Sequence, residues 1–308
     1  MLALLTVSLP TASPHRSRAF AALSRLLAGF ALTAVAGAGC SRGPATVQAE
    51  LDEARRLAAD VRVQFNKATD ASNRAVMAET DESSIAFARE AEQNSAAVEH
   101  DVATLSPLLN GLGISKEIQI LAGFQKQFSS YRAVDKDILG LAVENTNLKA
   151  QRLSFGPARE AADHLVPALA QLLPSLTASE QCRAQGLATS ALLSVRELQT
   201  LQGPHIASSD DAAMTALEQQ IAALETKASG ALNALHGLVE PSSLSAAQAA
   251  FEQFKGFDAQ IVTLSRRNSN VRSLDLALRV KPPLATACDD SARELQAALA
   301  NEGSKATR

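Results

Sequence analysis

The apolar residues of this chain recur at the spacing of long bundle helices. Between residues 46 and 79, small and apolar side chains return every seven residues in two interleaved series, and charged residues occupy the other faces. This pattern predicts an amphipathic helix over 46–79. The two series are Val47, Ala54, Val61, Ala68 and Ala75, and Leu51, Ala58, Phe65 and Ser72.

Capping residues and prolines divide the rest of the chain into further helices. Thr80 opens a second helix that stops at Asn110-Gly111, and a third runs from Ser115 to the Phe155-Gly156-Pro157 sequence. Thr177 and Glu180 form a capping-box pattern. We expect helices over about 46–79, 81–110, 115–155, 157–174, 177–202, 211–238, 243–281 and 283–300, with Gly203-Pro204 and Pro282-Pro283 as breaks.

One stretch of the chain occurs twice. Residues 124–155 return 123 residues later, in diverged form, around 251–276. A shared order of apolar and polar positions over this length indicates an internal duplication. The matched pairs include Phe128/Phe251, Tyr131/Phe254, Asp135/Asp258, Ile138/Ile261, Asn145/Asn268, Asn147/Asn270 and Leu153/Leu276.

These patterns predict an all-α protein. The chain has no Trp and one Tyr and is rich in Ala and Leu, which favours helices over sheets. Four amphipathic helices with short connections form an antiparallel bundle, so the duplication predicts two tandem antiparallel four-helix bundles after an N-terminal signal peptide. The expected segments are 1–39 (signal peptide), 40–45 (lipidated tether), 46–174 (first bundle), 175–302 (second bundle) and 303–308 (disordered tail).

The N-terminus has the features of a targeting segment. Arg16, Arg18 and Arg25 precede Leu26–Cys40, an uncharged apolar run of 15 residues, whereas a membrane span needs about 20. The small residues before Cys40 resemble the lipobox of bacterial lipoproteins, which implies a lipid on that cysteine. The alternative is ordinary secretion, with cleavage after Ala36 or Ala38. The lipobox predicts a protein attached to a membrane on the periplasmic side of a bacterial cell envelope.

The charge balance and the absence of catalytic motifs limit the partners and reactions that we expect. Without the three arginines of the first 40 residues, the chain carries 26 basic against 32 acidic residues, so we expect no nucleic-acid partner. It contains no HExxH, CxxCH, Gly-rich phosphate loop or Gly-x-Ser-x-Gly, so we expect no cofactor, no metal and no catalysis. His164, Asp163 and Glu160 could form part of a metal site, but a solvent-exposed helix face explains their spacing better. Cys182 and Cys288 are expected to be two free, buried thiols.

Both copies place polar residues on an apolar helix face. Asp135 and Asn145 lie on this face in the first copy, and Asp258 and Asn268 in the second. A buried acid needs a partner, a proton or a wet pocket. These groups therefore either line a ligand pocket or fix helix register, and the sequence favours register. If there is a pocket, Tyr131 favours the first copy, because its hydroxyl adds a polar group that Phe254 lacks.

The candidate ligand-binding residues are therefore Tyr131, Asp135, Asn145, Asp258 and Asn268. Asn147 and Asn270 are expected to face outward or towards a bundle end.

The block from Tyr131 to Asp163, with its ENTN and LSFGPAR sequences, resembles the third and fourth helices of the sensor domain of methyl-accepting chemotaxis receptors. The resemblance implies an extracytoplasmic helical bundle that binds a small solute or a binding protein. No second membrane span or signalling coiled coil follows in this sequence, so we expect no transmembrane signalling by this chain alone. The expected function is that of a lipid-anchored binding protein of sensor type. A structural or adaptor lipoprotein of the envelope is the alternative, and an exported enzyme is third.

Overall fold

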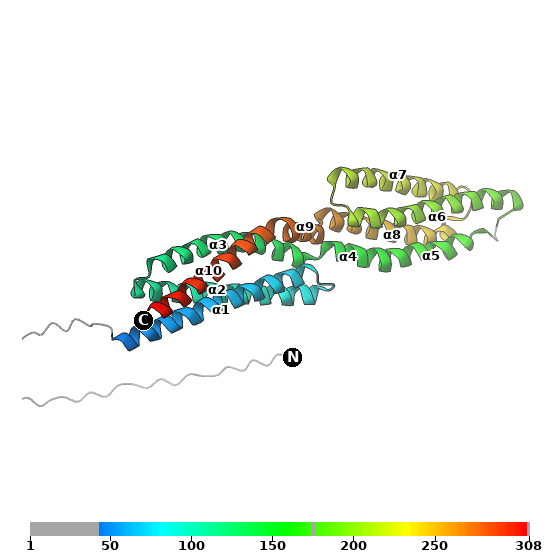
Figure 1. Cartoon of the computed structure of the whole chain (residues 1–308). Coiled ribbons are helices and arrows are strands. Elements are labelled where there is room, and N and C mark those ends of the chain that lie inside the picture. The colour runs from blue at the N-terminus through cyan, green and yellow to red at the C-terminus, as the bar shows by residue number, and fades with distance from the viewer. Residues whose placement is uncertain (1–42, 174–175, 307–308) are drawn as a thin grey trace, which may run out of the picture. The chain divides into compact units, whose positions relative to one another are not determined.

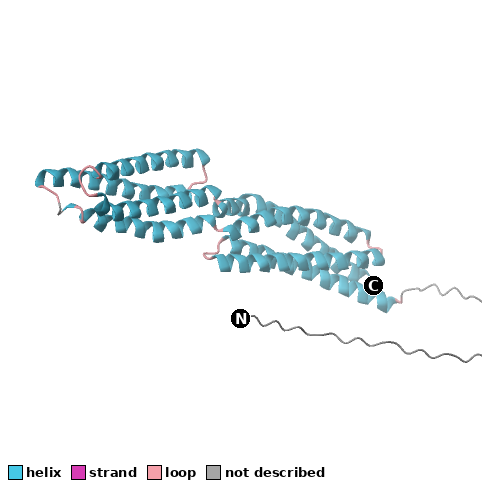
Figure 2. Cartoon of the chain, turned by 180° about the vertical axis from the view of Figure 1, so that it is seen from behind, coloured by secondary structure: helices cyan, strands magenta, loops and turns pink. Residues whose placement is uncertain are grey.

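A computed structural model describes residues 43–173 and 176–306 of the chain. Every secondary-structure element in these residues is a helix, as the sequence predicts, and loops connect the helices; the two ranges contain no strand (Figure 2). They belong to one compact unit. The predicted signal peptide and Cys40 lie outside the described residues. None of the described helices has both the length and the apolar character needed to cross a membrane.

The helices follow one another with short connections (Figure 1). Two short π-helical turns, η1 and η3, lie within otherwise α-helical segments. The elements are α1 (Pro44–Val76), α2 (Asp81–Leu112), α3 (Ser115–Glu144), α4 (Thr146–Leu153), η1 (Ser154–Ala158), α5 (Arg159–Ala170), α6 (Ala178–Ala207), α7 (Asp211–Leu235), α8 (Pro241–Arg267), α9 (Ser269–Asp275), η3 (Leu276–Val280) and α10 (Lys281–Ala306).

The first bundle consists of α1, α2, α3 and α10, which pack against one another. The seven-residue series of α1 faces its core, where Ala54 and Phe65 are almost inaccessible to solvent. Val47, at the start of that series, is the exception and is 39% exposed. Helix α10 contributes Cys288 and Leu295 to the same core. The apolar stripe therefore determines which face of α1 is buried.

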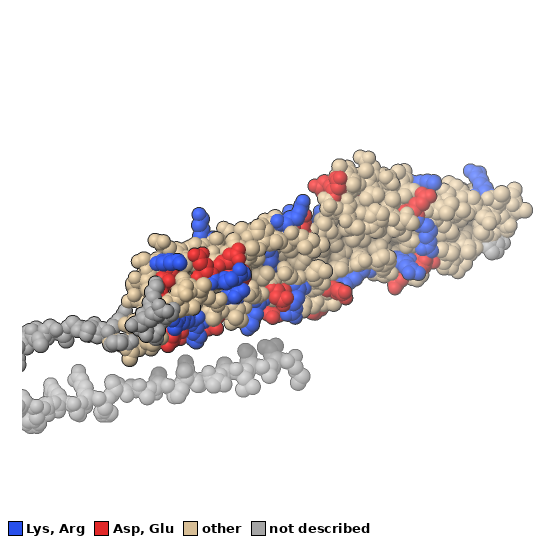
Figure 3. Space-filling view, viewed as in Figure 1, with Lys and Arg blue, Asp and Glu red and all other residues tan. Residues whose placement is uncertain are grey.

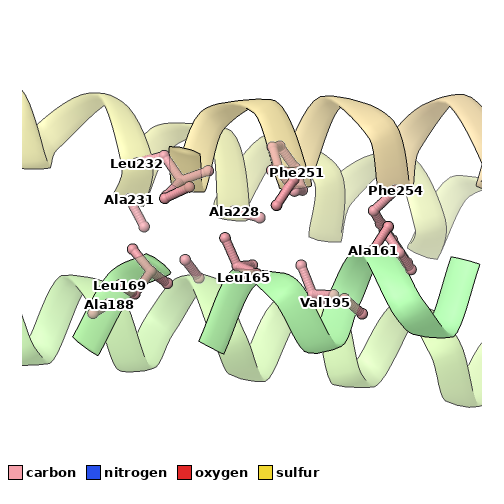
Figure 4. Close-up of a cluster of buried hydrophobic side chains, with 14 of the residues drawn as sticks. Ala161, Leu165, Leu169, Ala188, Val195, Ala228, Ala231, Leu232, Phe251 and Phe254 are labelled. Carbon is pink, nitrogen blue, oxygen red and sulfur yellow. The ribbon is translucent and has the colours of Figure 1, made fainter. Parts of the chain in front are cut away.

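The second bundle consists of α5, α6, α7 and α8. Figure 4 shows part of its core, in which Leu165 of α5 and Val195 of α6 point towards Phe251 and Phe254 of α8. Alanines such as Ala228 of α7 let the helices approach closely between these larger side chains. The second bundle thus has a core of its own, separate from that of the first bundle.

Two helical paths join the bundles, one from each copy of the duplicated segment, and each is interrupted once, at an asparagine. Helix α3 of the first bundle runs on through α4 and η1 into α5 of the second. Helix α8 of the second bundle runs on through α9 and η3 into α10 of the first. This grouping corrects the tandem order expected over 46–174 and 175–302. The last helix of each copy packs in the bundle of the other copy.

The reason for this exchange is that the expected proline boundaries do not reverse the chain. Pro157 lies inside η1, and Pro282 and Pro283 lie in the first turn of α10, where a missing backbone N–H is tolerated. The α-helices break earlier, at Asn145 and Asn268, which adopt left-handed conformations with φ of 50° and 55°. Asparagine accepts this conformation more readily than most residues.

The two paths cross just after these breaks and bond to each other reciprocally. The backbone N–H of Thr146 donates to Ser269 Oγ at 3.1 Å, and that of Ser269 donates to Thr146 Oγ1 at 3.0 Å. In the next pair, the backbone N–H groups of Asn147 and Asn270 donate to each other's Oδ1 atoms, both at 3.1 Å. Both asparagines therefore face one another at the adjoining ends of the bundles. This local two-fold relation agrees with the duplication in the sequence.

Other local expectations are confirmed or corrected. Thr80 accepts a hydrogen bond from the backbone N–H of Ser83 at 3.1 Å, and Thr177 begins the predicted capping box. Helix α6 continues through Gly203-Pro204 to Ala207, beyond the expected break. Both cysteines are free, but only Cys288 is buried, because Cys182 lies on an exposed face of α6. On the face shown in Figure 3, acidic and basic side chains are interspersed.

Candidate functional site

Asp135 lies at the centre of a buried polar cluster in the first bundle. Its side chain is fully buried, and Oδ1 accepts a hydrogen bond of 2.5 Å from Ser72 Oγ. The ammonium group of Lys281 lies 3.2 Å from the same oxygen and also donates to Ser72 Oγ and Asn73 Oδ1. Lys281 is only 2% exposed and comes from α10. The second copy therefore supplies the counter-charge for the acid of the first copy.

Burial lowers the pKa of Lys281, and the neighbouring Asp135 carboxylate acts in the opposite direction. Removing either partner would leave the other as an uncompensated charge in the core, which is strongly destabilising. Asp135 Oδ2 accepts no hydrogen bond from the described residues, yet its carboxylate is still compensated by the lysine. The pair thus ties α10 to α3, and Ser72 and Asn73 tie it to α1.

Tyr131 lies in the same core, and its hydroxyl group has a hydrogen-bond partner. Its hydroxyl lies 3.1 Å from Thr69 Oγ1, and its ring packs edge-on against Phe65 at 5.0 Å between centroids. The Phe128 ring is stacked with it at 6.1 Å. Burial, with the charge of Asp135, raises the pKa of the Tyr131 phenol. The hydroxyl that favoured the first copy as a binding site is therefore satisfied by a neighbouring helix.

Asn145 and Asn268 belong to the crossing between the copies. Asn145 Oδ1 accepts from Asn270 Nδ2 at 2.9 Å, and Asn268 Oδ1 accepts from Asn147 Nδ2 at 2.8 Å. Asn268 Nδ2 also donates to the carbonyl of Ser208 at 2.8 Å. These bonds hold the two paths in register, which is the structural role considered for them from the sequence.

Asp258 has the position of Asp135 but different neighbours. It is 1% exposed, and Oδ1 accepts a hydrogen bond of 2.6 Å from Gln202 Nε2. Oδ2 is buried and has no hydrogen-bond partner among the described residues. At the position matching Lys281, the first copy has the buried residue Ala158. Burial raises the pKa of the Asp258 carboxyl, and the Gln202 bond together with the nearby His205 only partly opposes this effect.

A pocket of about 300 Å³ lies between α7 and α8, with Asp258 in its lining. Its other polar lining residues are Glu218 and Glu225, both on α7. Glu225 is half-buried and forms no hydrogen bond or ion pair with any described residue. Burial and the Asp258 carboxyl raise its pKa, and the Lys255 ammonium opposes this effect in part. Ile221 and Val262 contribute to the apolar part of the lining. The pocket therefore combines apolar walls with carboxyl groups.

Glu218, at one side of the pocket, is already paired. Arg266 Nε donates to its Oε1 at 2.6 Å, and the buried His205 places Nε2 3.0 Å from the same oxygen. The other ring nitrogen of His205 lies 2.6 Å from Ser265 Oγ. The hydrogen bond from Arg266 lowers the pKa of Glu218. This network fixes α6, α7 and α8 beside the pocket. Asp258 and Glu225, the other two acids of the lining, form no ion pair with any described residue.

The sequence did not single out Gln202, His205, Glu218 or Glu225. The predicted break at Gly203-Pro204 leaves His205 outside the helix expected over 177–202 and Gln202 at its last position. Their signal was the helical spacing itself, since they continue the stripe of Val195 and Leu198 on α6. Glu225 follows Ile221 by one helical turn. The sequence therefore places an acid beside the apolar stripe of α7, and this position could have marked Glu225 as a candidate.

The described residues include no group of three His, Cys, Asp or Glu side chains that could hold a metal ion. His164 and Asp163 are exposed on α5, where Asp163 pairs with Arg196 at 2.7 Å.

Comparisons with known proteins found no matching family model, no matching curated protein and no matching solved structure.

Proposed function

We propose that this chain is a lipid-anchored protein of the bacterial cell envelope that binds a small solute without catalysis, in the manner of a receptor sensor domain. The signal-like segment with Cys40 and the resemblance of Tyr131–Asp163 to chemoreceptor sensor domains support the location and the type. The observation that carries the binding function is Asp258, a buried carboxyl without a cationic partner in the lining of a pocket.

A buried carboxyl with one oxygen unbonded and no ion-pair partner destabilises a protein, so a position of this kind needs an explanation. The first bundle shows that the same position is stabilised by a lysine from α10. The second bundle has no such lysine and instead has a pocket beside the carboxyl. Binding sites often retain groups that reduce the stability of the unliganded protein. Ligand binding explains both the pocket and the missing partner.

A panel of small metabolites, screened by thermal unfolding of the full chain, tests the binding function. A solute that binds the native state should raise the melting temperature as its concentration increases. The Asp258→Asn variant should lose this rise, and Glu160→Gln, an exposed acid outside the pocket, should retain it. If no solute raises the melting temperature, the alternative of a structural or adaptor lipoprotein replaces this proposal.

The membrane attachment is tested separately. A Cys40→Ser variant should lose incorporation of labelled lipid and leave the membrane fraction. Continued fractionation with membranes would contradict lipidation at Cys40 and would leave the solute-binding function untouched.

A further inference from the structure

The charges around the pocket between α7 and α8 indicate what kind of solute it accepts. All three ionisable residues in its lining are acids, and only Glu218 has a cation, Arg266, at hydrogen-bond distance. The nearest lysine on α8, Lys255, pairs with Glu252 at 3.1 Å and lies outside the lining. An anionic solute would therefore meet like charge, whereas a cation would meet two carboxyl groups, Asp258 and Glu225, that form no ion pair with any described residue.

The hydrogen-bonding capacity of Asp258 points the same way. A carboxylate only accepts hydrogen bonds, and Oδ2 of Asp258 receives none from the described residues. An ammonium group in the pocket supplies the compensating charge, and a small shift of the atoms that bury Oδ2 would let it donate to that oxygen as well. Charge-assisted bonds of this kind are among the strongest in proteins. A neutral alcohol would supply a donor without the charge.

The apolar walls favour an organic cation over a metal ion. Hard metal ions require several oxygen ligands, and the described residues offer no cluster of three ligating side chains. Ile221 and Val262, together with Ala222 and Ala259, instead suit an alkyl or aryl group. A pocket of about 300 Å³ is at the small end of the usual range for ligand sites.

The first bundle contains an intramolecular example of the same chemistry. There the ammonium group of Lys281 lies 3.2 Å from the matching carboxylate of Asp135, inside the protein. In the second bundle Ala158 supplies no such group, and the pocket opens on another side of the acid, between α7 and α8. We propose that this pocket binds small organic ammonium ions, with Asp258 as the counter-ion and Glu225 as a second acceptor.

This inference rests on the proposed solute-binding function and specifies the charge of the solute. Isothermal titration of the full chain with n-butylammonium chloride tests it, at constant ionic strength. The matched probes are n-pentanol, sodium n-pentanoate and magnesium chloride. We expect saturable binding of n-butylammonium and no saturable binding of the other three.

The variants locate the site. Asp258→Asn should weaken n-butylammonium binding by about tenfold or more, because it removes a charged acceptor. Glu225→Gln should weaken it less, and the exposed control Glu160→Gln should not change it. Circular dichroism and thermal unfolding establish that each variant is folded before the titration.

The outcomes separate the two proposals. Absence of n-butylammonium binding, or binding that Asp258→Asn leaves unchanged, overturns the ammonium site. If a solute of another charge raises the melting temperature in an Asp258-dependent way, the solute-binding function survives and the ammonium assignment is wrong. If no solute of any charge binds, both proposals fail.

Discussion

Asp135 and Asp258 occupy matching positions in the two bundles and are almost equally buried, yet only Asp135 has a cationic partner. Lys281 reaches Asp135 because the last helix of the second copy packs in the first bundle. The corresponding helix of the first copy enters the second bundle with Ala158 at that position. The exchange of helices thus gives one acid a structural partner and leaves the other with a pocket. Two equally buried acids can therefore have different roles.

Breaking the pair in the first bundle should have the largest effect. Lys281→Met leaves Asp135 buried without its counter-charge, and we expect a loss of about 3–5 kcal/mol in the free energy of unfolding. Chemical denaturation measures this loss. The double variant Asp135→Asn, Lys281→Met should recover much of it, and Lys227→Met, at an exposed lysine, should change little. A small effect of Lys281→Met would show that the pair does not hold the bundle together.

The crossing allows a test of how far the two copies are equivalent. Asn147→Ala removes side-chain bonds to Asn268 Oδ1 and to the carbonyl of Ile206, at 2.8 and 2.7 Å. We expect a loss of about 1–3 kcal/mol in stability, and a similar loss for Asn270→Ala, because buried partners are left unsatisfied. Asn94→Ala, which removes one local bond within α2, is the control for a lost asparagine. Losses no larger than that of the control would mean that the reciprocal bonds are unimportant.

Replacing the acid of the second bundle should have a smaller effect of opposite sign. The raised pKa of Asp258 means that the folded protein retains this proton to a higher pH than the unfolded chain does. Above the unfolded pKa of about 3.9, Asp258 therefore reduces stability increasingly, until the pH exceeds its raised pKa. Asp258→Asn removes this penalty and should stabilise the unliganded protein by about 0.5–2 kcal/mol at neutral pH.

The pH dependence provides the control for this variant. At about pH 3, Asp258 is protonated in both the folded and the unfolded state, so the gain from Asp258→Asn should largely vanish. Denaturation curves at several pH values measure the difference. A gain that is independent of pH would contradict an origin in the ionisation of Asp258.

Much of the helical structure could be predicted from local patterns. The seven-residue series of α1, the Thr80 cap and the Thr177–Glu180 capping box depend on residues close in sequence, and the structure has all three. The grouping of the helices could not be predicted in this way. A proline such as Pro157 marks a change in backbone hydrogen bonding, but it does not show whether the chain reverses or continues.

The candidate site was only partly predictable for a related reason. Asp135 and Asp258 stood out as acids on apolar stripes, and both are buried. Their partners lie far along the chain: Lys281 follows Asp135 by 146 residues, and Gln202 precedes Asp258 by 56. From the sequence, the Tyr131 hydroxyl is a polar group that a ligand in the first copy could use. In the structure this hydroxyl bonds Thr69 Oγ1 instead. Periodicity shows which residues are buried, whereas the choice between pairing and binding depends on contacts between distant segments.

The most direct test of the account is a titration of the Asp258 carboxyl carbon by nuclear magnetic resonance in the unliganded chain. We predict a pKa above the ordinary aspartate value of about 3.9, because burial outweighs the opposing effects of the Gln202 hydrogen bond and of His205. In an Ala158→Lys variant, which introduces a lysine at the position of Lys281, the pKa of Asp258 should fall. A pKa at or below about 3.9 in the unmodified chain would show that its charge is already compensated, and would contradict the account.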